Sequence, residues 1–143
     1  MTSTLDAARP DMVVDADTHL TERHDLWTSR APAGMKDRMP HVEQVDGEAT
    51  WVVEGEVMGR AGAGGVVDKD NHKGRSYEAL YEWEIDRIHV GAYDPVARLA
   101  MMDEAGVHAQ VIFPNTVGLG GQGLSQAVLD PALRMLCVEM YND

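Results

Sequence analysis

Cysteine is nearly absent from this sequence, and long apolar runs are missing. The one cysteine among the 143 residues, Cys137, allows no internal disulfide, which agrees with a reducing compartment. No run approaches the ~18 apolar residues of a membrane-spanning helix, and the N-terminal MTSTLDAARPDM lacks the apolar core of a signal peptide. We therefore expect a cytoplasmic protein without a membrane partner.

Basic and aromatic residues are also scarce. The 12 Lys and Arg are outnumbered by 24 Asp and Glu, and the formal net charge of −12 argues against binding to nucleic acid or to an anionic membrane surface. A single Phe leaves Trp, Met and Val to fill the interior. The hydrophobic content of 44% and the mean hydropathy of −0.29 are nevertheless ordinary for a globular chain, and one domain is the default at this length.

The most informative stretch is VVDADTH, which ends at His19. Residues Met12–His19 have the composition of a strand, bounded by a proline before it and a polar segment after it. Side chains two apart share a face of a strand, so Asp15, Asp17 and His19 are expected on one face. The intervening apolar residues, Val14 among them, are expected to be buried on the other.

Asp17 and His19 are candidate metal ligands because a carboxylate and an imidazole would converge at the C-terminal end of this strand. One oxygen and one nitrogen ligand suit Zn²⁺, Mn²⁺ and Fe²⁺ about equally. Asp15, one pleat deeper, could hydrogen-bond a ligand or cap a nearby backbone group. The same D-x-D-x-H run is also compatible with the solvated face of an edge strand, although the valines on the opposite face favour the metal site.

Two helices are predicted from the same N-terminal signal, an aspartate N-cap followed by a proline. Asp94 is a candidate N-cap for a helix over Pro95–Ala105, which Gly106 would end in the left-handed conformation. Asp130 and Pro131 begin another helix in the same way, and its apolar residues recur at helical spacing. The members of this apolar stripe are Leu133, Leu136, Cys137, Met140 and Tyr141.

Between these helices, Val107–Phe113 predicts a second strand, closed by Pro114. Its nearly continuous apolar character is typical of a strand covered on both faces in a parallel sheet. The order strand, helix, strand, helix indicates an α/β fold with parallel strands joined by a right-handed crossover.

Residues 26–93 form a long insertion after the first strand. Within it, Trp51–Met58 predicts a small β-hairpin with a turn at Glu54 and Gly55, and Ser76–Ile88 is a candidate helix.

Other chemistry-bearing residues have weaker patterns. Residues 68–74, DKDNHKG, resemble a calcium loop but have Lys73 in place of the required glycine, so a calcium site is rejected. Glu22 and His24 follow the first strand and are expected mainly on the surface. The glycine-rich residues 116–125 predict an active-site loop after the second strand.

Three segments together resemble the amidohydrolase-related family that includes aminocarboxymuconate-semialdehyde decarboxylase. They are VVDADTHLTERHDLW, YDPVARLAMMDEAGVHAQVIFPNTVGLGG and ALRMLCVEMYND. The resemblance implies the N-terminal portion of a (β/α)8 TIM-type barrel, with the long insertion and its hairpin following strand 1. It also implies one divalent metal ion, Zn or Mn, at the C-terminal ends of the strands.

Carried over residue by residue, the resemblance places Asp17 and His19 on two metal-ligand positions and Asp15 on the acidic position that precedes them. Asp17 stands where many members have His, so hydrolysis and decarboxylation both stay open. The implied substrates are small carboxylated or cyclic molecules.

The length bears on activity, since such a barrel needs roughly 250 residues and a catalytic metal needs about three protein ligands. We expect residues 1–143 to be a single incomplete domain, the N-terminal part of a metal-dependent hydrolase barrel, and to be inactive alone. No catalytic residue is assigned. The alternative is a non-catalytic remnant, or half of a split enzyme that forms a homo-oligomer or is completed by a C-terminal chain.

Overall fold

The computed structural model describes residues 12–62, 64–115 and 130–143. Its elements, in chain order, are β1 (Val13–Leu20), the 3-10 helix η1 (Lys36–Arg38), β2 (His41–Val45), β3 (Glu48–Val53), β4 (Glu56–Arg60), α1 (Tyr77–Tyr81), the 3-10 helix η2 (Val90–Ala92), α2 (Pro95–Ala105), β5 (Val107–Pro114) and α4 (Pro131–Asn142). The chain has a mixed α/β fold with one parallel and one antiparallel sheet.

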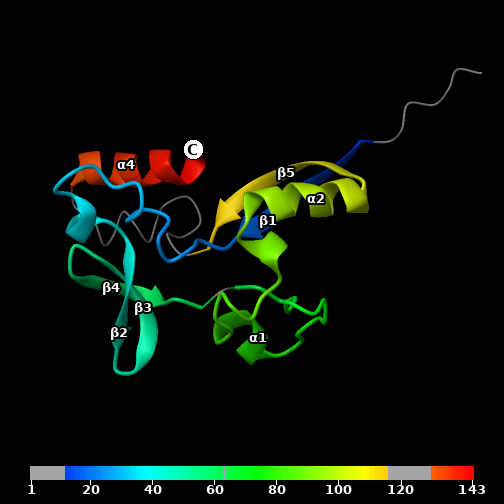
Figure 1. Cartoon of the computed structure of the whole chain (residues 1–143), viewed down its shortest axis with the longest axis horizontal. Helices are drawn as coiled ribbons and strands as arrows, with labels where there is room; N and C mark the ends of the chain where they lie inside the picture. The colour runs from blue at the N-terminus through cyan, green and yellow to red at the C-terminus, as the bar shows by residue number, and fades with distance from the viewer. Residues whose placement is uncertain (1–11, 63, 116–129) are drawn as a thin grey trace, which may run out of the picture.

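Strands β1 and β5 form a parallel pair, with α2 packed against β5 and η2 (Figure 1). The predicted helix Pro95–Ala105 is confirmed at both ends. The Asp94 carboxylate accepts a hydrogen bond from the Ala97 backbone N–H at 2.8 Å, and Gly106 ends the helix at a φ of 68°. The parallel arrangement predicted for the two strands is also confirmed.

The register of the parallel pair contains an irregularity in β1. Asp15 aligns with Gln110, but Thr18 aligns with Ile112, so three steps along β1 match two along β5. An extra residue of this kind is a β-bulge, which changes the side-chain alternation beyond it. The strict alternation predicted for Asp15, Asp17 and His19 is therefore interrupted between Asp15 and Thr18.

The antiparallel sheet has the order β2-β3-β4. The predicted hairpin is present as β3 and β4, and its turn has positive φ at Glu54 (51°) and Gly55 (83°), the signature of a type I′ turn. Strand β2 was not predicted. It joins β3 through a second turn of the same kind, at Asp46 (φ 53°) and Gly47 (φ 84°).

The larger hydrophobic core lies between this sheet and α4, which Figure 1 shows beside it. Trp27 and Trp51 meet edge to face at its centre, with ring centroids 5.5 Å apart, and the Trp27 indole N–H donates to the Cys137 carbonyl at 2.9 Å. The apolar stripe predicted for α4 is confirmed, because Leu133, Cys137 and Met140 are buried here.

A second, smaller core contains Ala79, Trp83 and Ile88. The helix predicted over Ser76–Ile88 is wrong beyond its first turn and a half, since α1 ends at Tyr81. The segment after it turns back instead, and it places Trp83 and Ile88 against Ala79. Tertiary packing therefore overrides the helical spacing of the sequence.

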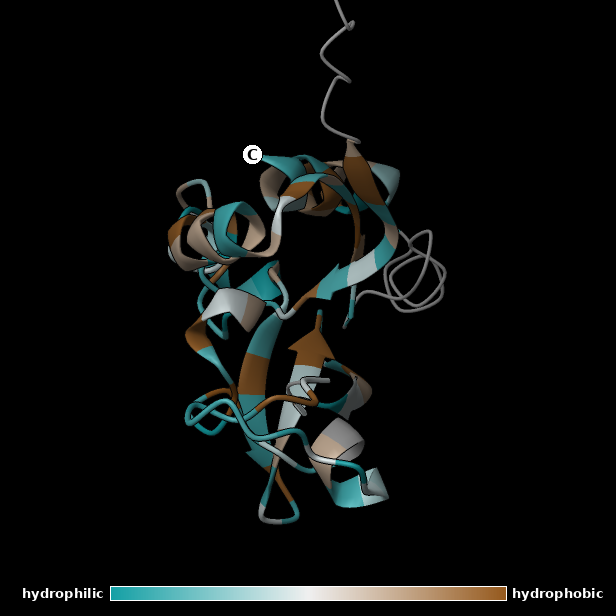
Figure 2. Cartoon of the chain, turned by 90° about the vertical axis from the view of Figure 1, so that its right-hand side faces the viewer, coloured by the Kyte–Doolittle hydropathy of each residue, from teal (hydrophilic) through white to brown (hydrophobic). Residues whose placement is uncertain are grey.

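The parallel pair leaves much apolar surface open. Val14 is 54% exposed on β1, and Val111 and Ile112 are 46% and 41% exposed on β5. The burial expected for Val14 and for both faces of β5 is therefore wrong. Figure 2 shows hydrophobic stretches along the strands, and the described residues contain no further strand that pairs with β1 or β5.

Candidate functional site

The candidate site lies where the two parallel strands end. His19 aligns with Phe113 and Leu20 with Pro114, so both strands end at the same edge. A cavity of about 280 Å³ opens there, and both Asp17 and His19 line it. Its lining also includes Thr18, Thr21, His89, Arg98 and Asn115. The C-terminal edge of a parallel sheet is the usual place for an α/β active site.

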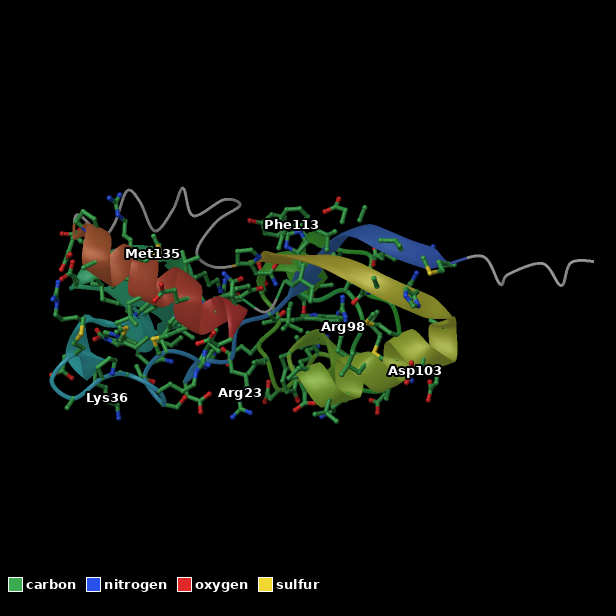
Figure 3. All side chains as sticks on the ribbon, turned by 90° about the horizontal axis from the view of Figure 1, so that it is seen from above. Arg23, Lys36, Arg98, Asp103, Phe113 and Met135 are labelled. Atoms are coloured by element: carbon green, nitrogen blue, oxygen red, sulfur yellow. The ribbon has the colours of Figure 1, made fainter. Side chains whose placement is uncertain are left out.

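Asp17 and His19 are both exposed, and the His19 ring lies 6.1 Å from the Phe113 ring between centroids. Figure 3 shows Phe113 on the side of β5 away from Arg98 and α2. A carboxylate and an imidazole are suitable donors for Zn²⁺ or Mn²⁺. They supply two of the about three protein ligands that a catalytic metal needs. In the described residues, no third histidine, cysteine or acidic side chain completes a close cluster with them.

Asp15 points to a different set of partners. Its Oδ2 accepts a hydrogen bond from the Gln110 side-chain amide at 3.1 Å, and its Oδ1 accepts one from the Asp17 backbone N–H at 3.3 Å. The Gln110 amide oxygen in turn accepts from Arg98 Nε at 2.8 Å. Asp15 is thus joined to the backbone of a candidate ligand and to α2.

His89 enters the same cavity from the start of η2. Its Nδ1 accepts a hydrogen bond from the Gly91 backbone N–H at 3.1 Å, so the neutral ring carries its proton on Nε2. The sequence pattern around this histidine gives no signal of a site. Its position at the end of the long insertion, directly before α2, is what brings it to the strand ends.

Asn115 is another residue that the sequence pattern did not single out. It follows β5 directly, and its side-chain amide donates to the Thr21 hydroxyl at 3.2 Å. The same rule that identified Asp17 and His19 could have found it, because it is the first polar residue after the second parallel strand.

A second cavity, of about 550 Å³, adjoins the first and shares His19 and Asn115 with it. Its other walls include Trp51 from β3 and Arg60 from β4. Arg60 lies 3.4 Å from Glu48 in an exposed ion pair, which leaves the guanidinium accessible to solvent. The antiparallel sheet therefore contributes an aromatic ring and a cation beside His19.

Glu22 and His24 differ from their expected surface positions. Glu22 is 3% exposed, and the His24 ring packs edge to face on Trp51 with 5.9 Å between centroids. Both follow β1 directly, at the point where the chain enters the larger core. Their burial depends on contacts with distant residues, which the local sequence pattern does not contain.

The rejected calcium loop does gather three potential ligands. Atoms of Asp68, Asp70 and His72 lie within 4.8 Å of one another. Asp68 Oδ1 already accepts the backbone N–H groups of Asp70 and His72, both at 2.9 Å, and the pKa of Asp68 is lowered chiefly by the latter bond. These bonds account for the cluster as the cap of its own turn.

Cys137 has no nucleophilic role in this arrangement. It is 1% exposed in the larger core, and burial raises the pKa of its thiol to about 11. A thiol of this kind stays protonated and unreactive near neutral pH.

The predicted active-site loop, residues 116–125, lies outside the described residues. None of the described helices has both the length and the apolarity needed to cross a membrane.

Comparison with known proteins supports the fold. No family model matches the sequence, and no curated protein does. The solved structure of an amidohydrolase from Mycobacterium avium subsp. paratuberculosis K-10 is similar, with a TM-score of 0.61 and 18% sequence identity. The similarity covers 94% of this chain and 38% of that chain. At this identity the likeness shows a shared fold, and this chain spans well under half the length of the protein it resembles.

Proposed function

We propose that the chain is the N-terminal part of a metal-dependent enzyme of the amidohydrolase-related type. The observation that carries the proposal is the position of Asp17 and His19, which line one cavity at the C-terminal end of a parallel strand. The structural likeness to an amidohydrolase supports it. In this proposal the parallel pair is the beginning of a (β/α)8 barrel, and residues outside the described ones complete the metal site.

Asp17 and His19 would hold the ion, with Asp15 behind them. A divalent ion bound there would act as a Lewis acid toward a substrate oxygen, which serves both hydrolysis and decarboxylation. The exposed positions of both side chains leave room for a further ligand and a substrate.

The adjoining cavity favours small carboxylated or cyclic substrates. Arg60 would attract a carboxylate, and the exposed ring of Tyr77, which also lines this cavity, offers an apolar wall for a substrate ring. Its volume of about 550 Å³ is within the range of small-molecule sites. The net charge of −12 makes this local cation the more significant, because most of the surface would repel an anion.

The second candidate is a split or remnant protein whose site is completed by another chain or not at all. The exposed apolar side chains of β1 and β5 favour this alternative, since they offer an open edge and face to further strands. In the completed form, a C-terminal chain or a second copy would be the partner.

The test is a calorimetric titration of the purified chain with Zn²⁺ and Mn²⁺. Metal analysis of the titrated protein then gives the number of bound ions. We expect weak binding at a single site that the variants Asp17→Asn and His19→Gln each reduce by about tenfold or more. The matched controls are Asp103→Asn and His108→Gln, which change exposed residues elsewhere.

Asp70→Asn distinguishes binding at Asp17 and His19 from binding at the loop cluster of Asp68, Asp70 and His72. Binding that is lost in Asp70→Asn but kept in Asp17→Asn and His19→Gln would place the ion on the loop cluster and overturn the proposal. Addition of a complementing C-terminal chain, with activity measured before and after, then distinguishes an incomplete enzyme from a remnant.

A further inference from the structure

A continuous chain of hydrogen bonds runs from α2 to the candidate ligands. Arg98 donates from Nε to the Gln110 side-chain oxygen, and Gln110 donates to Asp15. Asp15 accepts the backbone N–H of Asp17. We infer that Arg98 and Gln110 are positioning residues that fix the Asp17–His19 segment. The inference rests on the proposed metal site for its function.

The β1 bulge explains why such a device is needed. Between the aligned pairs Asp15–Gln110 and Thr18–Ile112, β1 has one residue more than β5. A bulge breaks the regular ladder and leaves its residues without the usual strand partners. Asp17 lies within it, so the direction of its side chain depends on what holds the residues on each side.

Both ends of the bulge are tied to Arg98. Before the bulge, Asp15 reaches Arg98 through Gln110, and after it the Thr18 hydroxyl accepts directly from Arg98 Nη2. Arg98 Nη1 donates to the Gly91 carbonyl at 3.2 Å, which anchors the guanidinium to η2. Figure 3 shows Arg98 between α2 and the strands. Its planar fork directs three different nitrogens at three separated acceptors, whereas the three donors of a lysine radiate from a single nitrogen.

Gln110 suits its place between Arg98 and Asp15 because a carboxamide both accepts and donates hydrogen bonds. Its oxygen faces the cation of Arg98, and its nitrogen faces the carboxylate of Asp15. A carboxylate at the same position would still pair with Arg98 but would repel Asp15. All of Asp15, Thr18, Arg98 and Gln110 are half-buried, where hydrogen bonds are stronger than in bulk water.

The first experiment needs no metal. Amide hydrogen exchange is followed by NMR in the wild type and in Gln110→Glu and Arg98→Lys. We expect exchange at Asp17 to become about tenfold faster in both variants, while the amides of Trp51 and Val53 in β3 keep their rates. The matched controls are Gln44→Glu, on an exposed part of β2, and Arg87→Lys, whose partners are Glu78 and Trp83.

Thr18→Val is a milder third variant, which keeps the experiment decisive if Gln110→Glu or Arg98→Lys fails to fold. It removes only the hydroxyl that accepts from Arg98, and the isosteric side chain fits the same space. We expect a smaller increase in exchange at Asp17 than in Gln110→Glu. Unchanged exchange at Asp17 in every folded variant of the three would overturn the inference.

The second experiment uses Co²⁺, whose visible absorption bands report the geometry of its ligands. We expect Gln110→Glu and Arg98→Lys to weaken Co²⁺ binding by about 10- to 100-fold and to shift these bands. Wild-type affinity and spectrum in both variants would overturn the positioning role, whatever the exchange rates show. If the wild type binds no Co²⁺, the proposed metal site fails, and the exchange data alone decide whether Arg98 and Gln110 fix the segment.

Discussion

His41 has acceptors on both ring nitrogens. Nδ1 lies 2.7 Å from the Met39 carbonyl, and Nε2 lies 2.8 Å from a Glu43 carboxylate oxygen. Only the protonated ring donates from both nitrogens, so this environment favours the imidazolium. The pKa of His41 is accordingly raised, first by the Met39 carbonyl and then, against some desolvation, by Glu43.

The raised pKa makes the stability of the antiparallel sheet depend on pH. A group whose pKa is higher in the folded state stabilises that state fully below its unfolded pKa, and the contribution is lost as the pH rises through the folded value. We expect His41→Asn to lower the free energy of unfolding more at about pH 6 than at about pH 8.5. Urea unfolding at both pH values measures this difference.

The control for His41 is His108→Asn, which changes an exposed histidine on β5. It should cost little stability, because the side chain is exposed. An equal cost of His41→Asn at the two pH values would mean that His41 contributes through packing and not through its charge.

At the candidate site, the sequence predicted which residues belong to the site better than it predicted the directions in which their side chains point. The alternation of VVDADTH identified Asp17 and His19, and the structure brings both to one cavity. It could not show that Asp15 shares its side of β1 with Thr18, because the bulge follows from the pairing with β5. Arg60 and His89 were missed for a similar reason, since they reach the cavities only through the path of the long insertion.

The helix α4 depends on contacts with distant parts of the chain. Its N-cap, Asp130, accepts the N–H groups of Ala132 and Leu133 and also pairs with Arg38 at 2.9 Å. Arg38 contacts Glu54 in the β3–β4 turn as well, and it holds the pKa of Asp130 below its ordinary value. The start of the helix is thereby connected to the sheet that its apolar face covers.

Leu133 tests how far α4 stabilises this sheet. We expect Leu133→Ala to reduce the free energy of unfolding by about 2–5 kcal/mol, because the side chain is completely buried and its loss leaves a cavity. Met135→Ala, at a position 60% exposed on the same helix, should cost little. Chemical unfolding of both variants gives the comparison, and equal costs would show that α4 does not pack as described.

An element was predictable from the sequence where local residues determine its ends, and it was not where distant contacts determine them. The two capped helices were found because Asp94, Asp130 and the adjacent prolines are local signals. The short α1 was overestimated, since what ends it is the packing of Trp83 on Ala79. Strand β2 was missed despite a usable signal, the Asp46–Gly47 turn between two β-forming segments.

On the scale of the whole molecule, the exposed parallel pair governs how the chain behaves in solution. Apolar side chains on β1 and β5 lie beside strand edges that no other described strand pairs with. Surfaces of this kind promote association with other chains. Val96 and Leu99 of α2 are exposed as well.

We expect the purified 143-residue chain to self-associate with rising concentration, and Val111→Lys to shift it toward the monomer. Sedimentation velocity over a range of concentrations measures the change. Val57→Lys is the matched control, because Val57 is 60% exposed but lies on β4 of the antiparallel sheet. Equal effects of the two substitutions would show that the loss of any exposed apolar side chain, and not the parallel pair in particular, controls association.

The three tryptophans divide between the two hydrophobic cores. Trp27 and Trp51 lie edge to face in the larger one, whereas Trp83 lies in the smaller one beneath the Arg87 guanidinium, 4.4 Å from its ring centroid. The fluorescence of Trp83→Phe therefore reports the larger core alone, and its difference from the wild-type fluorescence reports the smaller core. Loss of one signal before the other would reveal whether the two cores melt together or in sequence.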